Sequence, residues 1–440
     1  MNQNTRREFI KTTAGTAAVV SLIGTSAKWA GANDRIRVVI TGVNGRGQDH
    51  IKGFQSVKQA QIVGLCDVDQ NVLKKQASKV DESAKLYGDF REVLDDKDVD
   101  AVSIATPNHW HSVMGIWACQ ANKDVYVEKP LSHNIYEGRK LVEAARKYNR
   151  VVQHGTQSRS SSALQEAMEH LKNGAIGEIY SAKGTCYKWR RSIGHKPDAS
   201  APEGVDYNRW LGPAPERPFS ENRFHYNWHW HWDYGNGDIG NQGVHEMDIA
   251  RWGLEAFYGQ KLEHPYRVQA EGDHFMFEDD QETPNHLVST FRFPNVKAMF
   301  VFEVRHWISN VELPPLFKDG ENVVGNLFMG SEGIMMIRWY DHYEIYLGQK
   351  LQPGPKRVGG GNHYQNFIDA VLARKQPSAD VELGHYASSL CHLANAAYRV
   401  KDTLQFDPEK EECTNNPEAD AILQGRDRKY REGFGIPETI

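Results

Sequence analysis

Residues 37–51 read RVVITGVNGRGQDHI, a run of β-branched residues that gives way to glycines and then to polar residues. A short apolar run of this kind is typical of a buried strand, and the polar stretch behind the glycines suits a helix. Turns of this type bind dinucleotide phosphates, because the helix N-terminus offers free N–H groups and a partial positive charge. A purely structural glycine turn is the alternative.

The dinucleotide fingerprint places glycine at its first, third and sixth positions. These positions fall on Gly42, Asn44 and Gly47, and the turn also contains Gly45 and Arg46. Gly42 permits a tight turn and Gly47 a close approach of helix to strand, whereas Asn44 departs from the pattern. We predict that these five residues bind the cofactor.

The next apolar run, QIVGLCDVD, ends at Asp67. An acidic residue about 20 positions after the last fingerprint glycine binds the ribose hydroxyls of NAD. Its carboxylate also repels the 2′-phosphate of NADP, so the sequence favours NAD over NADP. The spacing argues against a merely structural turn.

Strands continue to alternate with helices to about residue 157, which predicts a doubly wound parallel sheet, a Rossmann domain over residues 33–157. Ligands bind beyond the carboxyl ends of such strands. The polar residues at those ends are further predicted cofactor contacts: Thr106, Asn108, His111, Glu128, Lys129 and Gln157.

Residues 158–440 show a different pattern, with alternating runs such as LVSTFRFPN and VKAMFVFEVR. Alternation of this kind predicts an open, largely antiparallel sheet with one packed face. We expect an α+β substrate-binding and oligomerisation domain here, with helices near residues 361–405 packing back on the first domain. The fold class is therefore α/β with two domains, as the length of 440 residues also suggests.

The N-terminus reads TRREFIK, followed by a short apolar stretch and AGA. Paired arginines, a weak apolar run and a small-residue cleavage site predict a twin-arginine signal over residues 1–32 and a periplasmic location. No apolar run reaches the roughly 18 residues that span a bilayer. No basic block indicates nucleic-acid binding. Five dispersed cysteines without a CxxC motif favour buried free thiols, although a Cys391–Cys413 bridge is conceivable.

The stretch EKPLS after a predicted strand resembles a motif of the Gfo/Idh/MocA family of sugar oxidoreductases, here Glu128-Lys129-Pro130. The stretch GDIGNQGVHEMDIARW resembles the family's second motif, with His245 at the expected place and Asn241 where the family usually has Asp. We expect Asn241 and His245 to share one helix face, because they are four residues apart. The family often has a cis bond before the EKP proline.

The resemblance implies a carbohydrate substrate and a homo-oligomer, either a dimer or a tetramer. The EKP lysine of the family reaches substrate and nicotinamide together, so Lys129, His245 and Asn241 are the predicted catalytic residues. We expect His245 to be the base, since its unperturbed pKa is about 6.5. Lys129 would polarise the alcohol oxygen or act as the base itself if burial lowers its pKa. Asn241 cannot supply the carboxylate that usually polarises the histidine.

The segment HYNWHWHWDYGNGD contains His229, His231 and Asp233. In a strand these three side chains would share one face, as in a metal triad. The neighbouring tryptophans offer flat faces for sugar C–H groups, and ordinary packing is a third interpretation. We predict sugar contacts and no metal. Our substrate candidates are Arg159, Tyr187, Trp189 and His229.

The leading hypothesis is NAD-dependent oxidation of a secondary alcohol of a sugar or glycoside. Because free NAD is scarce outside the cytoplasm, we expect the cofactor to be tightly bound. An NAD-dependent glycosidase that works through transient 3-keto oxidation and elimination is the first alternative. A non-catalytic exported sugar-binding protein is the second.

Overall fold

The computed structural model describes residues 35–307, 321–437 and 439–440. Ile36–Ile440 form one compact unit. The predicted signal sequence and its cleavage site lie outside the described residues.

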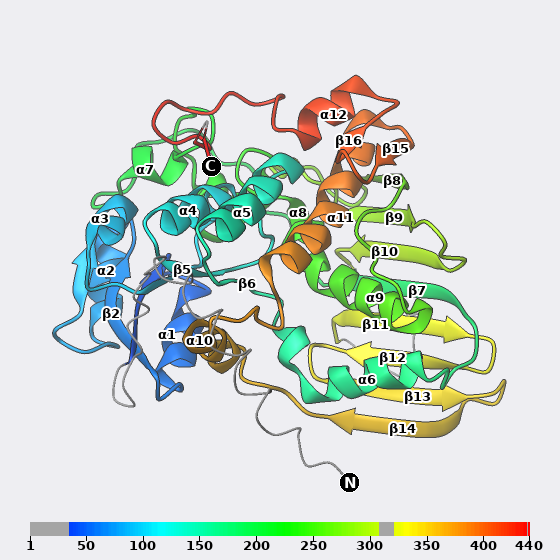
Figure 1. Cartoon of the computed structure of the whole chain (residues 1–440). Coiled ribbons are helices and arrows are strands. Elements are labelled where there is room, and N and C mark those ends of the chain that lie inside the picture. Colours follow the sequence, from blue (N-terminus) through cyan, green and yellow to red (C-terminus); the bar gives the residue numbers. More distant parts are fainter. Residues whose placement is uncertain (1–34, 308–320, 438) are drawn as a thin grey trace, which may run out of the picture. The chain divides into compact units, whose positions relative to one another are not determined.

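The first sheet has six parallel strands in the order β3-β2-β1-β4-β5-β6, as predicted for a Rossmann fold (Figure 1). Its strands are β1 (Ile36–Thr41), β2 (Ala60–Cys66), β3 (Lys85–Tyr87), β4 (Ala101–Ile104), β5 (Asp124–Val127) and β6 (Val152–His154). The helices between them are α1 (Gly47–Gln55), α2 (Gln70–Ala77), α3 (Phe90–Asp95), α4 (Asn108–Gln120) and α5 (Ile135–Lys147).

The opening apolar run is buried on both faces of this sheet. Val38 and Ile40 pack in a cluster with Phe54 of α1, whereas Val39 packs in another cluster with Leu141 of α5. Successive side chains of a strand point to opposite faces, so the middle of a central parallel strand, here Val38 to Ile40, is apolar at successive positions. This explains why β1 lacks alternation.

The second sheet has ten strands and is antiparallel except for the pairing of β7 with β10, which confirms the predicted class. Its strands are β7 (Ile179–Tyr187), β8 (Arg267–Asp273), β9 (His286–Arg292), β10 (Met299–Arg305), β11 (Val323–Gly330), β12 (Gly333–Arg338), β13 (His342–Leu347), β14 (Gln352–Val358), β15 (Leu404–Asp407) and β16 (Glu412–Cys413).

The remaining helices cover one face of this sheet or connect it to the first. They are α6 (Ser162–Lys172), α7 (Tyr207–Leu211), α8 (Gly237–Asn241), α9 (Gly243–Tyr258), α10 (His363–Ala373), α11 (Val381–Val400) and α12 (Pro417–Leu423), with 3₁₀ helices η1 (Gln157–Ser160), η2 (Glu221–Arg223) and η3 (His225–Trp230). Figure 1 shows α6, α9 and α11 along the second sheet.

The two sheets are joined by helices from the second half of the chain. Phe367 of α10 is buried in the cluster with Phe54 of α1, and α11 packs against both α5 and β8. The C-terminal tail, red in Figure 1, runs from α12 back to the first sheet, where Phe434 and Ile436 pack on its core.

All five cysteines are buried and free, as the dispersed pattern predicted, so the conceivable Cys391–Cys413 bridge is absent.

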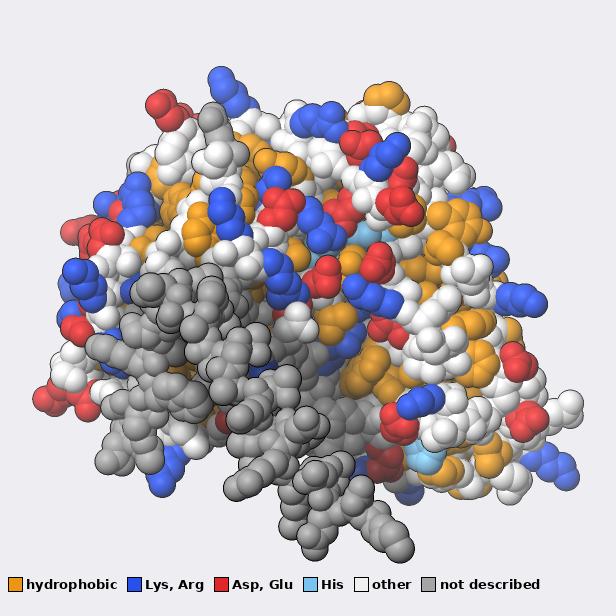
Figure 2. Space-filling view, viewed as in Figure 1, with side chains coloured by type: hydrophobic (Ala, Val, Ile, Leu, Met, Phe, Trp, Pro, Cys, Tyr) orange, Lys and Arg blue, Asp and Glu red, His pale blue; other side chains and the backbone are white. Residues whose placement is uncertain are grey.

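Across the described part of the chain, no helix is both long and apolar enough to cross a bilayer. On the face drawn in Figure 2, acidic and basic side chains of the described residues are interspersed.

Candidate active site

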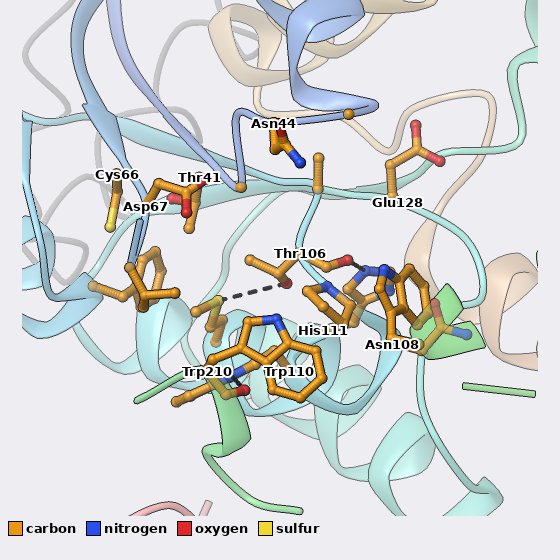
Figure 3. A pocket seen from close by; sticks show the side chains of 18 of the residues that line it. Thr41, Asn44, Cys66, Asp67, Thr106, Asn108, Trp110, His111, Glu128 and Trp210 are labelled. Atoms are coloured by element: carbon orange, nitrogen blue, oxygen red, sulfur yellow. Dashed lines mark hydrogen bonds between the residues drawn. The ribbon is translucent and has the colours of Figure 1, made fainter. Parts of the chain in front are cut away.

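A pocket opens at the carboxyl ends of the parallel strands, where the topology predicts it. It is lined by ten of the twelve predicted cofactor residues: Gly42, Asn44, Gly45, Arg46, Asp67, Thr106, Asn108, His111, Glu128 and Lys129. Gly47 and Gln157 do not line it, whereas Asn241 does. In Figure 3, Asp67 and Glu128 lie at opposite ends of the view, with Asn44 and Thr106 between them.

The turn after β1 has room only for glycine at two positions. Gly42 has φ +81°, and a Cβ there would lie 2.7 Å from the Ala105 carbonyl oxygen. A Cβ on Gly47 would lie 2.1 Å from the Gly42 oxygen. Nothing lies within 4 Å of a Cβ built on Gly45, so the turn is open toward the pocket there. This cradle fits a pyrophosphate at the N-terminus of α1.

Asp67 lies just after β2 and closes one end of the pocket. Its carboxylate accepts hydrogen bonds from the Val43 N–H at 2.8 Å and from the Asp69 N–H at 3.1 Å. Burial raises the pKa of Asp67 to about 6. Oxygens facing an open pocket from this position suit ribose hydroxyls, so the residues present fit NAD at both the ribose and the pyrophosphate.

Glu128 organises the opposite end. Its carboxylate accepts from Arg46 Nε and His50 Nε2, each at 3.0 Å, and from Gln157 Nε2 at 3.1 Å. Burial alone would raise the pKa of Glu128, but Arg46 and His50 more than offset it and hold that pKa well below its usual value. Gln157 does not line the pocket, and its contact with the site is the hydrogen bond to the Glu128 carboxylate.

Lys129 extends from the end of β5 to the second motif. Its peptide bond to Pro130 is cis, and its Nζ donates to the main-chain oxygen of Asn241. Burial lowers the pKa of Lys129 to about 8; the Glu128 carboxylate opposes this shift and the Lys188 ammonium adds to it. The sequence thus correctly predicted that these distant segments meet.

His245 lies in the first turn of α9 and is buried. Its Nδ1 has no hydrogen-bond partner among the described residues, and its ring centroid lies 4.7 Å from that of Tyr340. Burial, together with the Lys129 charge, lowers the pKa of His245 well below 6.5. The expectation of a histidine that titrates near neutrality is therefore wrong for this environment.

Asn241 and His245 do not lie on one continuous helix. Asn241 ends α8, Gln242 adopts φ −116°, and Gly243 begins α9. The Asn241 amide donates to Asp238 at 3.1 Å rather than to His245. The glycines flanking this stretch weaken helix propagation, which the four-residue spacing does not reveal.

The substrate candidates are scattered. The Arg159 guanidinium forms two 2.7 Å hydrogen bonds with Asp248, and both side chains are buried. The Tyr187 hydroxyl donates to Glu303 at 2.6 Å. Trp189 is 61% exposed. None of Arg159, Tyr187 and Trp189 lines the cofactor pocket, and their substrate role stays a prediction.

The histidine-rich segment forms η3 and a turn, not a strand, so the three side chains of the hypothetical metal triad share no face. His229 Nδ1 contacts the Tyr226 carbonyl, His231 Nε2 contacts the Asn222 carbonyl at 2.7 Å, and Asp233 pairs with Arg217 at 2.7 Å. The His229 Nε2 is buried without a partner among the described residues. The aromatic neighbours Tyr226 and Trp228 line the pocket instead.

Another cluster of metal-ligand type lies away from the pocket, where His264, His385 and Glu411 meet. Both imidazole Nε2 atoms contact the same Glu411 oxygen, at 2.7 and 2.9 Å, and Arg139 pairs with the same carboxylate. A carboxylate already neutralised by an arginine is a poor cation ligand, so we interpret this cluster as structural.

A strap formed by residues 203–228 crosses the Rossmann loops and was not predicted. The Gln70 N–H donates to the Gly204 carbonyl, and the Asp206 N–H donates to the Val68 carbonyl, each at 2.9 Å. Arg209 pairs with Asp89 at 3.3 Å.

The strap also reaches the glycine turn, where Asn44 Nδ2 contacts His225 Nδ1 at 2.9 Å. Trp210 of the strap, which is labelled in Figure 3, and Phe434 of the tail both line the pocket. The aromatic density of residues 224–232 was the one sequence signal for this strap.

Comparisons with known proteins agree with this geometry. Residues 36–156 match the NAD-binding Rossmann fold of the GFO_IDH_MocA oxidoreductase family, and residues 170–283 and 349–432 match its C-terminal alpha/beta domain. An inositol 2-dehydrogenase of Salmonella paratyphi B is 29% identical over 154 residues, 34% of this chain and 46% of that protein. A glycosyl hydrolase family 109 protein of Shewanella sp. ANA-3 is 33% identical over 166 residues, 32% of this chain and 36% of that protein.

Among solved structures, a levoglucosan dehydrogenase in complex with NADH and levoglucosan superposes with a TM-score of 0.65 at 18% identity, over 84% of this chain and 99% of that one. The chain spans less than half the length of the curated relatives named above. Because both halves of the family model match in order, and the sheet order and the EKP lysine agree, the chain belongs to the Gfo/Idh/MocA oxidoreductase family, whose first domain is an NAD-binding Rossmann fold.

Proposed function

We propose that this protein oxidises a secondary alcohol of a sugar or glycoside, with NAD as its cofactor. The observation that carries the proposal is the contact between Lys129 and Asn241, which brings the EKP lysine and the His245 helix together at the Glu128 end of the cofactor pocket. The named activities of the relatives, inositol and levoglucosan dehydrogenation, support the same class of substrate.

Bound NAD supplies the hydride acceptor. The chain itself must position the alcohol and remove its hydroxyl proton. Lys129, with a pKa of about 8, is neutral in roughly a tenth of molecules at pH 7 and exchanges protons readily there. We therefore assign the proton transfer to Lys129 Nζ.

His245 has a different role in this proposal. It stays neutral, because its pKa lies well below 6.5, and we assign its buried, unpartnered Nδ1 to orienting the substrate hydroxyl, although His245 does not itself line the cofactor pocket. Asn241 fixes Lys129 through its main-chain oxygen.

A panel of monosaccharides and glycosides, each incubated with the protein and NAD, tests the proposal. A keto-sugar product that forms together with NADH, and that is lost in Lys129→Met, is the expected result. A protein that binds NAD but oxidises no member of the panel would contradict it.

A redox-neutral glycosidase is the second candidate, favoured by the contacts of the strap and tail at the cofactor groove. Arg209 and His225 contact the Rossmann loops and Phe434 lines the groove, so these contacts would slow the release of a bound dinucleotide. A cofactor retained in this way is suited to a reaction that reduces and reoxidises it within one turnover. A chromogenic glycoside distinguishes the two candidates: aglycone release without net NADH indicates the glycosidase.

We also propose that the protein is exported by the twin-arginine route and carries its NAD with it as a homo-oligomer. Folded export suits a protein that acquires a cofactor in the cytoplasm. Cell fractionation of the wild type and of an Arg6→Lys, Arg7→Lys variant tests the route. Native mass spectrometry of the purified protein measures bound NAD and subunit number together.

A further inference from the structure

A second ammonium group lies beside the predicted catalytic lysine. Lys188 directly follows β7, and its Nζ donates to the side-chain oxygen of Gln242 at 2.5 Å. Lys129 Nζ donates to the main-chain oxygen of the adjacent Asn241. Asn241 and Gln242 are consecutive, and each accepts a hydrogen bond from one of the two lysine ammonium groups. The positive charge of Lys188 contributes to the lowered pKa of Lys129.

The acids around this pair are already neutralised by other partners. Glu128 pairs with Arg46 at 3.0 Å, and Asp238 pairs with Arg190 at 3.0 Å. No carboxylate of the described residues forms an ion pair with Lys188. Two ammonium groups near each other in a partly buried site repel, so this arrangement is unfavourable in the absence of an anion.

Glu246 is the acid nearest to Lys188 by connectivity, and it does not supply the missing charge. Gln242 Nε2 donates to Glu246 Oε1 at 2.9 Å and to the Tyr340 hydroxyl at 2.8 Å. Glu246 Oε2 is buried without a partner among the described residues. Burial raises the pKa of Glu246 to about 8, so its side chain is mostly a neutral carboxylic acid at pH 7.

The Gln242 amide fixes the direction of the Lys188 side chain. Its oxygen faces Lys188 and its nitrogen faces two oxygen acceptors, so the amide orientation is determined by three contacts. Lys188 Nζ uses one of its three donors in this contact. Lys188 does not line the cofactor pocket, but it is partly exposed, so its other donors are accessible to a ligand that extends beyond that pocket.

We propose that Lys188 binds a carboxylate of the substrate, so that the protein acts on a uronic acid or a uronide rather than on a neutral sugar. This inference rests on the proposed function. Because Lys129 must be neutral to accept the hydroxyl proton, one ammonium group, Lys188, is left to match a carboxylate of single charge, whereas a phosphate ester carries nearly two charges.

The test compares matched pairs of methyl glycosides, glucoside with glucuronide and galactoside with galacturonide, together with glucose 6-phosphate. In at least one pair we expect kcat/KM for the uronide to exceed that of the neutral partner about 10- to 100-fold, the usual effect of one charge-assisted hydrogen bond. In Lys188→Met this ratio should fall to near one, because a change in the pKa of Lys129 affects both members of a pair alike and cancels in the ratio. Lys183→Met, in β7 itself and paired with Glu303 at 2.8 Å, should leave the ratio unchanged.

Calorimetric binding of the uronides to NADH-loaded protein provides a second readout that needs no turnover. Uronide binding that weakens at least 10-fold in Lys188→Met supports the inference even if no sugar of the panel is oxidised. Neutral sugars that are oxidised as well as uronides in every pair would overturn it while the proposed function stands. Selective use of glucose 6-phosphate, or unchanged uronide affinity in Lys188→Met, would also overturn it.

Discussion

Replacing Lys129 by Met should abolish activity and at the same time stabilise the fold. The pKa of Lys129 falls from 10.5 to about 8 on folding, mainly through burial. A shift of this size means that keeping the ammonium charged in the folded protein costs roughly 3 kcal/mol. Loss of the hydrogen bond to the Asn241 oxygen offsets about 1 kcal/mol, which leaves a net gain of about 2 kcal/mol for the variant at pH 7.

The sign of the pH dependence follows from proton binding. Between pH 8 and about 10.5 the unfolded chain binds this proton and the folded protein does not, so wild-type stability rises with pH through this window. The penalty is therefore largest below pH 8 and disappears above about pH 10.5. The advantage of Lys129→Met should shrink correspondingly as the pH is raised.

Thermal unfolding at matched NAD content measures this effect. For a chain of this size, 2 kcal/mol corresponds to an increase of about 2 °C in Tm at pH 7. Lys75→Met, at an exposed position of α2, is the control and should stay within about 0.5 kcal/mol of the wild type at every pH. A Lys129→Met protein that is less stable than the wild type, or whose advantage does not change with pH, would refute the reasoning.

Three further variants test the cofactor site and the core. Asp67→Ala removes the predicted ribose ligand, and we expect the Kd for NAD to rise at least 10-fold while the Kd for NADP changes little, as titration calorimetry would show. Gly42→Ala forces a side chain into a left-handed backbone and within 2.7 Å of the Ala105 oxygen, so NAD should be lost from the purified protein; retained NAD in mass spectrometry would contradict this. Arg159→Met removes both 2.7 Å hydrogen bonds of the buried Asp248 carboxylate and leaves it a single 3.4 Å contact with Arg251, so it should cost about 3–5 kcal/mol in urea unfolding, most of it recovered on adding Asp248→Leu; a loss below 1 kcal/mol would argue against the buried pair.

The sequence by itself predicted the features that depend on local chemistry. A glycine turn after an unbroken apolar strand requires Gly42 and Gly47 for steric reasons, and Asp67 follows at the spacing of one strand–helix–strand unit. The position of Lys129 after β5 follows from the rule that parallel strands end at one edge of the sheet.

Tertiary structure decided the features that depend on neighbours distant in the chain. The alternation of His229 and His231 suits a strand, but the segment forms η3 and the turn after it. There the His229 imidazole contacts the Tyr226 carbonyl, and the His231 imidazole contacts the Asn222 carbonyl. Arg159 has the chemistry of a substrate ligand, and only packing shows that Asp248 occupies it.

The charge states at the site were likewise beyond the reach of the sequence. Burial lowers the pKa values of His245 and Lys129 and raises that of Glu246, and on these shifts we base the proposal that Lys129 rather than His245 is the base. Residue type sets only the reference pKa, whereas desolvation and neighbouring charges, such as that of Lys188, are properties of the folded chain.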